Sequence, residues 1–253
     1  MNITSNNEII GKVFHYFQEI ESTNGYANEL IAKSAPVEGT VILAAHQTKG
    51  KGQQGNEWDS AAGQNLLMSV VLRPHWIPIQ HQFNLNMAVS VALQESMAAQ
   101  VAAECAIKWP NDLMIDGHKV AGILIENTIQ KQALAYSVVG IGLNVNQTFF
   151  PPELTRATSM KRISGQDFQL DKVLSLLLER LEYWYLELMH GRLEGIRARY
   201  LKHLFQYQER CTYRVNGQMI EGQILGVNKF GKLMVEVKQS LVEYNTKEIE
   251  YVY

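Results

Sequence analysis

The segment from residue 108 to 126 constrains the fold more than any other part of the chain. It opens with Lys-Trp-Pro-Asn-Asp, ends with Lys-Val-Ala-Gly-Ile-Leu-Ile-Glu, and carries Asp116-Gly117 between the two. An Asp-Gly pair between apolar runs is a strong signal for a two-residue hairpin turn. We therefore expect two antiparallel strands, at 113–115 and 120–125, that hold several charged side chains in one small region of a sheet.

Each of the five residues at the start of this segment, Lys108 to Asp112, is a weak indication of a functional site when it is taken alone. Trp109 alone is better interpreted as a core aromatic, Asp112 as a turn cap and Lys108 as a solvated charge. Pro110 has no backbone donor and keeps the preceding residue extended, so Asn111 and Asp112 are expected at a corner between a strand and a loop. Because the five occur together, we interpret them as part of a binding site.

A glycine-rich loop, Gly50-Lys-Gly-Gln-Gln-Gly55, follows a predicted buried strand at 40–45. Glycine permits positive φ and close approach of the backbone to a ligand, and successive free N–H groups in such a turn form an anion-binding concavity. The loop is neither a Walker loop nor a dinucleotide fingerprint, because it lacks Gly-Lys-Ser/Thr and does not open a helix with Gly-x-Gly-x-x-Gly. Taken alone, it is interpreted equally well as a plain connection.

Apolar periodicity divides the rest of the chain into a strand-rich part, a helical part and a second strand-rich part. Further predicted strands lie at 13–20, 65–72 and 134–141, and predicted helices lie at 22–31, 82–102, 171–189 and up to about 204. After residue 207, five short strands are separated by turn residues such as Asn216-Gly217. The expected fold class is α+β: a domain at 1–206 with a mixed sheet and packed helices, then an SH3-like β-barrel at 207–253.

Composition excludes several classes of protein. The formal net charge is −2 without long runs of like charge, which argues against non-specific attraction to DNA or to an anionic membrane. Cys105 and Cys211 lie far apart without Cys-x-x-Cys spacing, and the histidines lack ligand spacing, so we expect no disulfide framework and no metal site built by the protein. Without a secretion signal or an apolar run of membrane-spanning length, the expected location is a reducing cytoplasm.

The chain resembles the biotin protein ligases through matches in order and spacing from about residue 15 to 150. The matching segments are Ser22-Thr23-Asn24, Gln47, the Gly50–Gly55 loop with Trp58, Asn65-Leu66, Lys108–Asp112, Lys119–Glu126 and Gly140–Asn146. The resemblance implies a mixed-sheet catalytic domain of the class II synthetase and biotin ligase kind, followed by a small SH3-like domain. It also implies a ligase-only type, because the chain begins almost directly at the first catalytic strand, without the N-terminal helix-turn-helix domain of many members.

The reaction implied by the resemblance has two halves. Biotin attacks the α-phosphate of ATP to give biotinyl-5′-AMP, and a lysine of a carrier protein then takes the biotinyl group. Both reactants of the first half are anions, so the site must supply cations and N–H groups, and Mg²⁺ is expected to bridge phosphate oxygens. By resemblance, Lys119 contacts the biotin carboxyl and the α-phosphate, Lys108 and Lys51 add positive charge, and Asp112 orients or deprotonates the carrier amine.

The resemblance also implies the binding positions and the partner. The ureido ring of biotin needs donors and acceptors, which Ser22, Thr23, Asn24 and Gln47 can supply. The other expected contacts with biotin or the nucleotide are Gly50, Gly52, Gln53, Trp58, Asn111, Gly122, Gly140, Gly142 and Asn144, the last at adenine. The expected partner is the biotin carboxyl carrier domain of a biotin-dependent carboxylase, without specific DNA binding, and a homodimer is left open.

The sequence departs from the family pattern at one place, and three alternative functions remain to be separated from the ligase. Gln53 and Gln54 stand where family members commonly have arginines, so we expect weaker retention of the activated intermediate. A lipoate protein ligase shares the two-step chemistry, although its ligand lacks a ureido group. A non-catalytic biotin- or adenylate-binding sensor is disfavoured because Lys108, Asn111, Asp112 and Lys119 are all present. A further interpretation makes the C-terminal barrel an interaction module carried by an inert domain.

Overall fold

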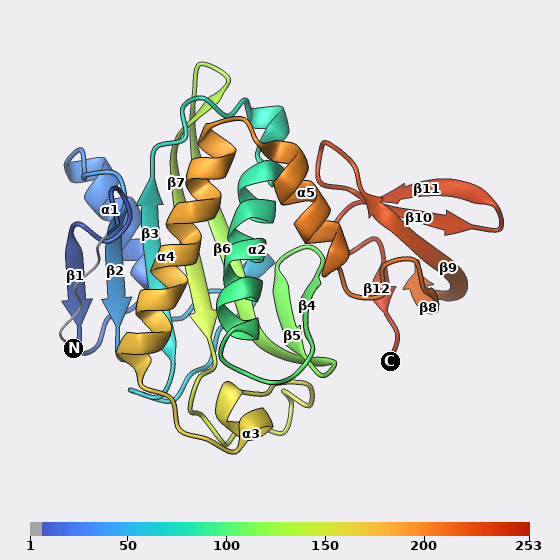
Figure 1. The fold of residues 1–253 in the computed structure, drawn as a ribbon, viewed down its shortest axis with the longest axis horizontal. Helices are drawn as coiled ribbons and strands as arrows, with labels where there is room; N and C mark the ends of the chain where they lie inside the picture. Colours follow the sequence, from blue (N-terminus) through green and yellow to red (C-terminus); the bar gives the residue numbers. More distant parts are fainter. Residues whose placement is uncertain (1–6) are drawn as a thin grey trace.

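The computed structural model describes residues 7–253, apart from the side chain of Gln54, and its larger unit is a seven-stranded mixed sheet (Figure 1). The strand order is β1-β2-β3-β7-β6-β5-β4, in which β1 and β2 are parallel and the other neighbours are antiparallel. The strands are β1 (Phe14–Phe17), β2 (Thr40–Ala44), β3 (Leu66–Leu72), β4 (Cys105–Lys108), β5 (Asp112–Ile115), β6 (His118–Gln130) and β7 (Ala133–Leu143). The expected α+β class with a mixed sheet is confirmed.

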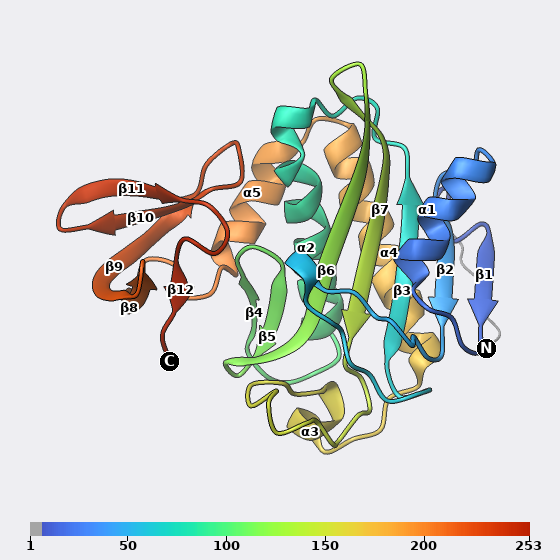
Figure 2. The ribbon, with the colours of Figure 1, turned by 180° about the vertical axis from the view of Figure 1, so that it is seen from behind.

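Helices cover both faces of this sheet. Helices α2 (Phe83–Ala98), α4 (Leu170–Met189) and α5 (Leu193–Lys202) lie on one face, where α2 packs against the other two (Figure 1). Helix α1 (Thr23–Lys33) lies on the opposite face against β2, β3 and β7, beside the long loop that follows β2 (Figure 2). The glycine-rich loop and the N-terminal end of α1 therefore share one side of the sheet.

The central strands are buried because both faces of the sheet are covered. Strands β2 and β3 are buried at every residue, and apart from Thr40 and Ser69 their sequences are apolar throughout instead of alternating. Helix α4 has the predicted stripe of buried residues, which includes Leu174, Leu177 and Leu181. Among the described residues, no helix combines the length and the apolar character needed to cross a membrane.

The C-terminal part forms a five-stranded antiparallel sheet in the order β11-β10-β9-β8-β12 (Figure 1). Its strands are β8 (Arg210–Val215), β9 (Gln218–Val227), β10 (Leu233–Val237), β11 (Ser240–Tyr244) and β12 (Glu250–Tyr251). The small β domain is present, and its described pairings leave β11 and β12 as the two ends of the sheet. Its buried side chains join the core of the larger unit, and the buried Trp109 donates from Nε1 to the Gly231 carbonyl at 2.9 Å. The domain boundary between residues 206 and 207 stays a prediction.

Two of the hairpin turns were predicted from the sequence, and a third was not, so one predicted strand was too short. The predicted turns at Asp116-Gly117 and Asn216-Gly217 have positive φ at both residues. Lys131-Gln132, which joins β6 to β7, also has positive φ at both residues, 48° and 64°. Lysine and glutamine rarely adopt that conformation, so the sequence held no signal for this hairpin, and the strand predicted at 120–125 extends to Gln130 in β6.

Two further elements differ from the prediction. The helix expected over 82–102 ends at Ala98, since the chain leaves it to enter the short edge strand β4, which pairs Lys108 with Asp112 of β5. The short helix α3 (Met160–Ser164), capped by the Ser159 side chain, was not predicted. Both elements depend on pairing or capping partners that apolar periodicity does not reveal.

Both cysteines are free, as expected. Cys105 is buried in β4, and burial raises the pKa of its thiol to about 11, so the thiol stays protonated at neutral pH. Burial also raises the pKa of the Cys211 thiol. Neither cysteine has the lowered pKa of a catalytic nucleophile.

We predict that replacing Leu93→Ala in α2 lowers the free energy of unfolding by about 2–5 kcal/mol, because a fully buried leucine leaves a cavity when it is shortened. Leu241→Ala in β11 is the matched control: its side chain is 54% exposed, and the change should stay within about 0.5 kcal/mol. Urea unfolding followed by circular dichroism measures both. Equal losses in the two variants would contradict the assignment of α2 to the core.

Candidate active site

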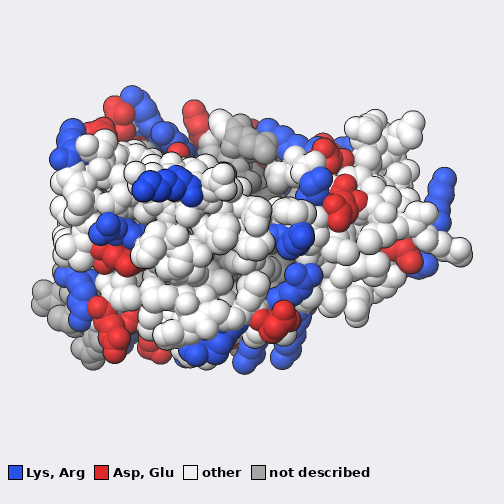
Figure 3. Space-filling view, turned by 90° about the horizontal axis from the view of Figure 1, so that it is seen from above, with Lys and Arg blue, Asp and Glu red and all other residues white. Residues whose placement is uncertain are grey.

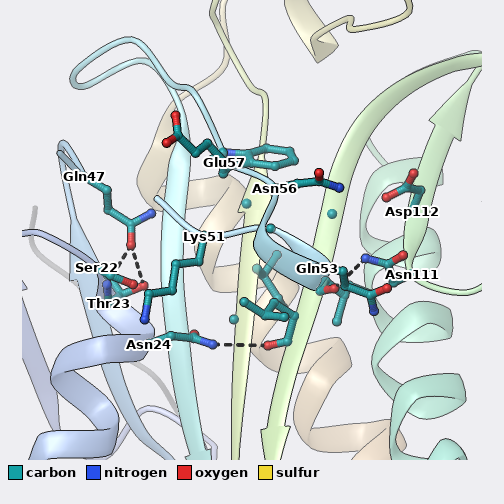
Figure 4. A pocket seen from close by; sticks show the side chains of 18 of the residues that line it. Ser22, Thr23, Asn24, Gln47, Lys51, Gln53, Asn56, Glu57, Asn111 and Asp112 are labelled. Carbon is teal, nitrogen blue, oxygen red and sulfur yellow. Dashed lines mark hydrogen bonds between the residues drawn. The ribbon is translucent and has the colours of Figure 1, made fainter. Parts of the chain in front are cut away.

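A cavity of about 240 Å³ opens on the face of the large sheet that carries α1. Its floor comes from β3, β6 and β7, one wall from the first turn of α1, and its cover from the loop after β2 (Figures 2 and 4). The corner between β4 and β5 forms another wall. The turn between β11 and β12 completes the lining with Thr246 and Lys247.

The first turn of α1 gives the cavity a polar end. Ser22 is the N-cap, and its hydroxyl accepts from the Gly25 N–H at 3.3 Å, as the Ser-Thr-Asn sequence predicts. The backbone N–H of Thr23 donates to Gln47 Oε1 at 2.7 Å, which orients the Gln47 amide beside the helix (Figure 4). Ser22, Thr23 and Asn24 are all buried, so their remaining polar groups face each other or the cavity.

A chain of buried polar contacts continues behind this end. The Ser69 hydroxyl oxygen lies 2.7 Å from Thr23 Oγ1 and 2.6 Å from Asn24 Oδ1. Asn24 Nδ2 donates to Glu126 Oε2 at 2.7 Å. Glu126 lies two residues beyond Leu124 of β6, so this hydrogen bond joins the sheet to the first turn of α1.

The glycine-rich loop folds back on itself. The Trp58 N–H donates to the Gly50 carbonyl at 3.0 Å, and the Gly52 N–H donates to the Asn56 carbonyl at 2.7 Å. A Cβ at Gly50 would lie 2.4 Å from the Trp58 carbonyl oxygen, so packing within the loop already requires glycine there. The expected positive φ is found at Gly55, at 85°. Lys51 extends from this loop into the cavity (Figure 4).

Three glycines of the floor let other groups approach the sheet. Gly122 of β6 and Gly142 of β7 are directly paired, and a Cβ on Gly142 would lie 2.4 Å from the indole of Trp58. A Cβ on Gly140 would lie 2.3 Å from Asn24 Oδ1. The Trp58 indole therefore packs directly on the backbone of β6 and β7, where the glycines have no side chains. Its buried Nε1 has no hydrogen-bond partner in the described structure.

One lysine and one carboxylate form an ion pair at the other end of the cavity. Lys119 Nζ lies 2.7 Å from Asp112 Oδ1 and 5.5 Å from the ring centroid of Trp58. Their side chains are 38% and 18% exposed, so both groups are reachable from solvent. The hairpin between β5 and β6 brings them together. The ammonium group therefore lies beside the bare glycine floor.

The structure places most of the predicted site residues on this cavity. Those that line it are Ser22, Thr23, Asn24, Gln47, Lys51, Gly52, Gln53, Trp58, Asn111, Asp112, Lys119, Gly122, Gly140 and Gly142. Gly50 lies outside this lining, on the neighbouring hollow under the loop. Asn144 is also outside: its Nδ2 donates to the Thr158 carbonyl at 3.0 Å, and its buried Oδ1 has no partner in the described structure.

The expected convergence of Lys108 and Lys119 on one cavity is not observed. Lys108 Nζ lies 5.0 Å from the ring centroid of Tyr251 and 5.3 Å from that of Tyr253, outside the cavity lining. Burial raises the pKa of Tyr251 well above its usual value, so the phenol is neutral, and its aromatic face attracts the ammonium. The side chain of Lys108 is held by the C-terminal residues instead of pointing to the site.

Sequence reasoning missed several lining residues. Asn56 and Glu57 belong to the glycine-rich loop, where their proximity to the matched segment was a usable signal. Lys247 belongs to the C-terminal sheet, more than 100 positions beyond Lys119, and has a positive φ of 72°. No pattern in the sequence indicates that this turn reaches the cavity.

The face of the molecule that Figure 3 presents, seen from above, carries charges of both signs. Figure 3 shows basic and acidic side chains interspersed on the face that it presents, without a continuous field of one sign. This distribution agrees with the net charge of −2. Such a surface gives little non-specific attraction to polyanions.

Comparison with known proteins agrees with this geometry. Residues 16–144 match the biotin/lipoate A/B protein ligase family. A bifunctional ligase/repressor BirA of Bacillus spizizenii is 32% identical over 246 residues, which cover 96% of this chain and 75% of that protein. A biotin–[acetyl-CoA-carboxylase] ligase of Mycobacterium tuberculosis is 36% identical over 165 residues, 64% of this chain and 59% of that protein.

Solved structures give the same result. The biotin protein ligase from Aquifex aeolicus in complex with biotin and ATP superimposes with a TM-score of 0.79 at 25% identity, covering 94% of this chain and 98% of that one. The fold and the cavity thus define an enzyme class that handles a small acid together with a nucleotide. The chain belongs to the biotin/lipoate protein ligase family.

We predict that Gly142→Ala displaces Trp58 from the floor, because the added methyl group would lie 2.4 Å from its ring. Backbone amide exchange of residues 50–58 should become faster as the loop loses this contact. Gly195→Ala in α5 is the matched control, since no atom lies within 4 Å of the added Cβ. Unchanged exchange in the Gly142 variant would contradict the packing of Trp58 on the floor.

Proposed function

We propose that the chain activates biotin with ATP to biotinyl-5′-AMP and transfers the biotinyl group to a lysine of a carrier protein. The observation that carries this proposal is the single cavity, which joins a polar end built from α1 to a cationic end at Lys119 across a bare glycine floor. The relatives described above, one of them bound to biotin and ATP, support it.

The polar end suits the ureido ring. A ureido group offers two N–H donors and one carbonyl acceptor, and a buried unpaired polar group costs about 1–3 kcal/mol. Thr23 and Ser22 supply hydroxyl groups, and the Nε2 group of Gln47 has no hydrogen-bond partner within the described residues. Leu124, which lies on the same face of the sheet as the floor glycines, and Trp58 supply apolar contact for the rest of the ligand.

The cationic end suits the activation step. The carboxylate of biotin and the α-phosphate repel each other, so an ammonium between them lowers the barrier to their contact. Lys119 is placed for this role, and Lys51 adds charge from the loop. The structure offers no group of three or more potential metal ligands among its described residues. Mg²⁺ bound to the phosphates of ATP would neutralise charge there and ease the departure of pyrophosphate.

In the transfer step, Asp112 is the group that meets the carrier lysine. Its carboxylate accepts hydrogen bonds only, and Lys119 occupies one oxygen, which leaves the other to hold the incoming amine. A lysine amine in water has a pKa near ~10.4, so the amine must be relieved of a proton before it attacks. We assign Asp112 the orientation of the amine. The proposed carrier is a biotin carboxyl carrier domain of a biotin-dependent carboxylase.

A lipoate protein ligase and a non-catalytic sensor are the alternatives that one assay separates. Purified chain is mixed with ATP and Mg²⁺, and pyrophosphate release is measured with biotin or with lipoate. Release that depends on biotin supports the proposal, release that depends on lipoate replaces it, and no release with either points to a sensor. The cytoplasmic location and the lack of specific DNA binding stay predictions, and the sequence predicts neither a monomer nor a homodimer.

Lys119→Met should lower biotin-dependent pyrophosphate release by about 10²–10³-fold, because one electrostatic contact to the transition state is removed. Lys172→Met on the exposed face of α4 is the matched control. Lys108→Met should reduce the rate by less than about tenfold, since its ammonium lies at the Tyr251 ring, outside the cavity lining, and a cation–π contact of this kind is worth roughly 1 kcal/mol. A larger loss at Lys108 than at Lys119 would reverse the assignment of the two lysines.

Gln53→Arg should slow the release of biotinyl-5′-AMP in the absence of carrier by about tenfold, because a charged donor holds a phosphate more strongly than a neutral amide. Gln53 lines the cavity, whereas the exposed Gln64 of the same connection does not, so Gln64→Arg adds the same charge as a control. Release is followed by rapid filtration of labelled adenylate. Equal release from the wild type and the Gln53 variant would contradict a weakened hold in this chain.

A further inference from the structure

Glu126 lies outside the lining of the cavity yet touches the residues that form its polar end. Its Oε2 accepts from Asn24 Nδ2 at 2.7 Å and from Asn28 Nδ2 at 3.2 Å. Among the described residues, no lysine or arginine is ion-paired with this carboxylate, so its contacts are these amide donors. An ionised carboxylate can only accept hydrogen bonds.

This restriction fixes the orientation of the Asn24 amide. The NH₂ group must face Glu126, and a second contact of Nδ2, to the Leu124 carbonyl at 3.4 Å, has the same requirement. The amide oxygen therefore faces Ser69 at 2.6 Å. An amide oxygen is also only an acceptor, so the single hydrogen of the Ser69 hydroxyl is used on Asn24.

The direction of the next contact follows by elimination. The Ser69 and Thr23 hydroxyl oxygens are 2.7 Å apart, and one hydrogen must lie between them. Because the Ser69 hydrogen is already used, the Thr23 hydroxyl donates to Ser69. Gln47 Oε1, 3.0 Å from Thr23 Oγ1, is satisfied by the Thr23 backbone N–H at 2.7 Å. Thr23 Oγ1 is thus left with lone pairs and no hydrogen for the cavity.

We propose that Glu126 is a positioning residue that sets the direction of the Glu126–Asn24–Ser69–Thr23 relay, so that Thr23 presents a hydrogen-bond acceptor to the ligand. The ligand chemistry that this selects is an N–H donor at that point, next to a group that accepts from the Gln47 amide. The inference rests on the proposed function, in which the ureido ring of biotin supplies both. With the Asn24 amide reversed, Ser69 would donate to Thr23, and the Thr23 hydrogen would be free for Gln47 Oε1, 3.0 Å away, or for a carbonyl or ether oxygen of a ligand.

The central experiment compares biotin with a carbamate analogue in which one ureido N–H is replaced by oxygen. We measure the KM and kcat of pyrophosphate release for each acid and the KM for ATP. Wild-type enzyme should discriminate against the analogue whose missing N–H faces Thr23 by about 10- to 100-fold in kcat/KM, because that analogue leaves two acceptors facing each other. Both regioisomers of the analogue are tested, and only one should show the effect.

Glu126→Met removes the acceptor while keeping a side chain of similar length. The variant should lose most of this discrimination, with a raised KM for biotin and a KM for ATP within about twofold of wild type. Glu126→Gln retains an oxygen that can accept from Asn24, so it should restore much of the discrimination. Glu29→Met, an exposed carboxylate on the same helix as Asn24, is the matched control.

Ser69→Ala breaks the same relay at another link and serves where the Glu126→Met variant does not fold, as judged by its thermal midpoint. It should show the same loss of discrimination. Full discrimination in a folded Glu126→Met or Ser69→Ala variant overturns the relay. Absence of biotin-dependent release from the wild-type enzyme overturns the proposed function itself, so the two failures are distinguishable.

Discussion

The fold of the site depends on the absence of side chains at three positions of the sheet. Gly122 and Gly142 face each other across β6 and β7, and Gly140 lies two residues away on β7. With any larger residue, Trp58 could not rest on the sheet and Asn24 could not reach Ser69. The loop, the first turn of α1 and the hairpin between β5 and β6 therefore meet over one bare strip of backbone. That strip separates a polar end from a cationic end, which is the arrangement that a small acid and a nucleotide need.

The sequence predicted the parts of the structure whose chemistry is local. Ser22 caps α1, Asp116-Gly117 forms the expected hairpin, and the buried strands β2 and β3 were visible as apolar runs. The hairpin at Lys131-Gln132 was invisible, because its positive φ values are imposed by the pairing of β6 with β7 and not by residue preference. The site was predictable where residues belong to the matched segments. The placement of Lys108 and Lys247 was not, because both depend on how the C-terminal sheet packs against the larger unit.

The charged groups of the cavity lie mainly at the end away from α1. Lys119 and Asp112 form an ion pair next to the floor, so the site holds its cation in place before any ligand binds. Lys108 contributes to the contact with the C-terminal tyrosines instead, so its role in this account is structural. Gln53 brings a neutral amide to the cover of the cavity, where an arginine would bring charge. The lysines that line the cavity are Lys51, Lys119 and Lys247, and the proposed function assigns the cationic stabilisation to the first two.

The central claim is that both substrates meet over the glycine floor, with their anionic groups at Lys119. A crystal structure of the chain with biotin and a non-hydrolysable ATP analogue tests it most directly. The account predicts a ureido nitrogen within hydrogen-bond distance of Thr23 Oγ1, and the biotin carboxylate and α-phosphate both in contact with Lys119 Nζ. A biotin ring bound away from α1, or phosphates gathered at Lys108 instead of Lys119, would contradict it.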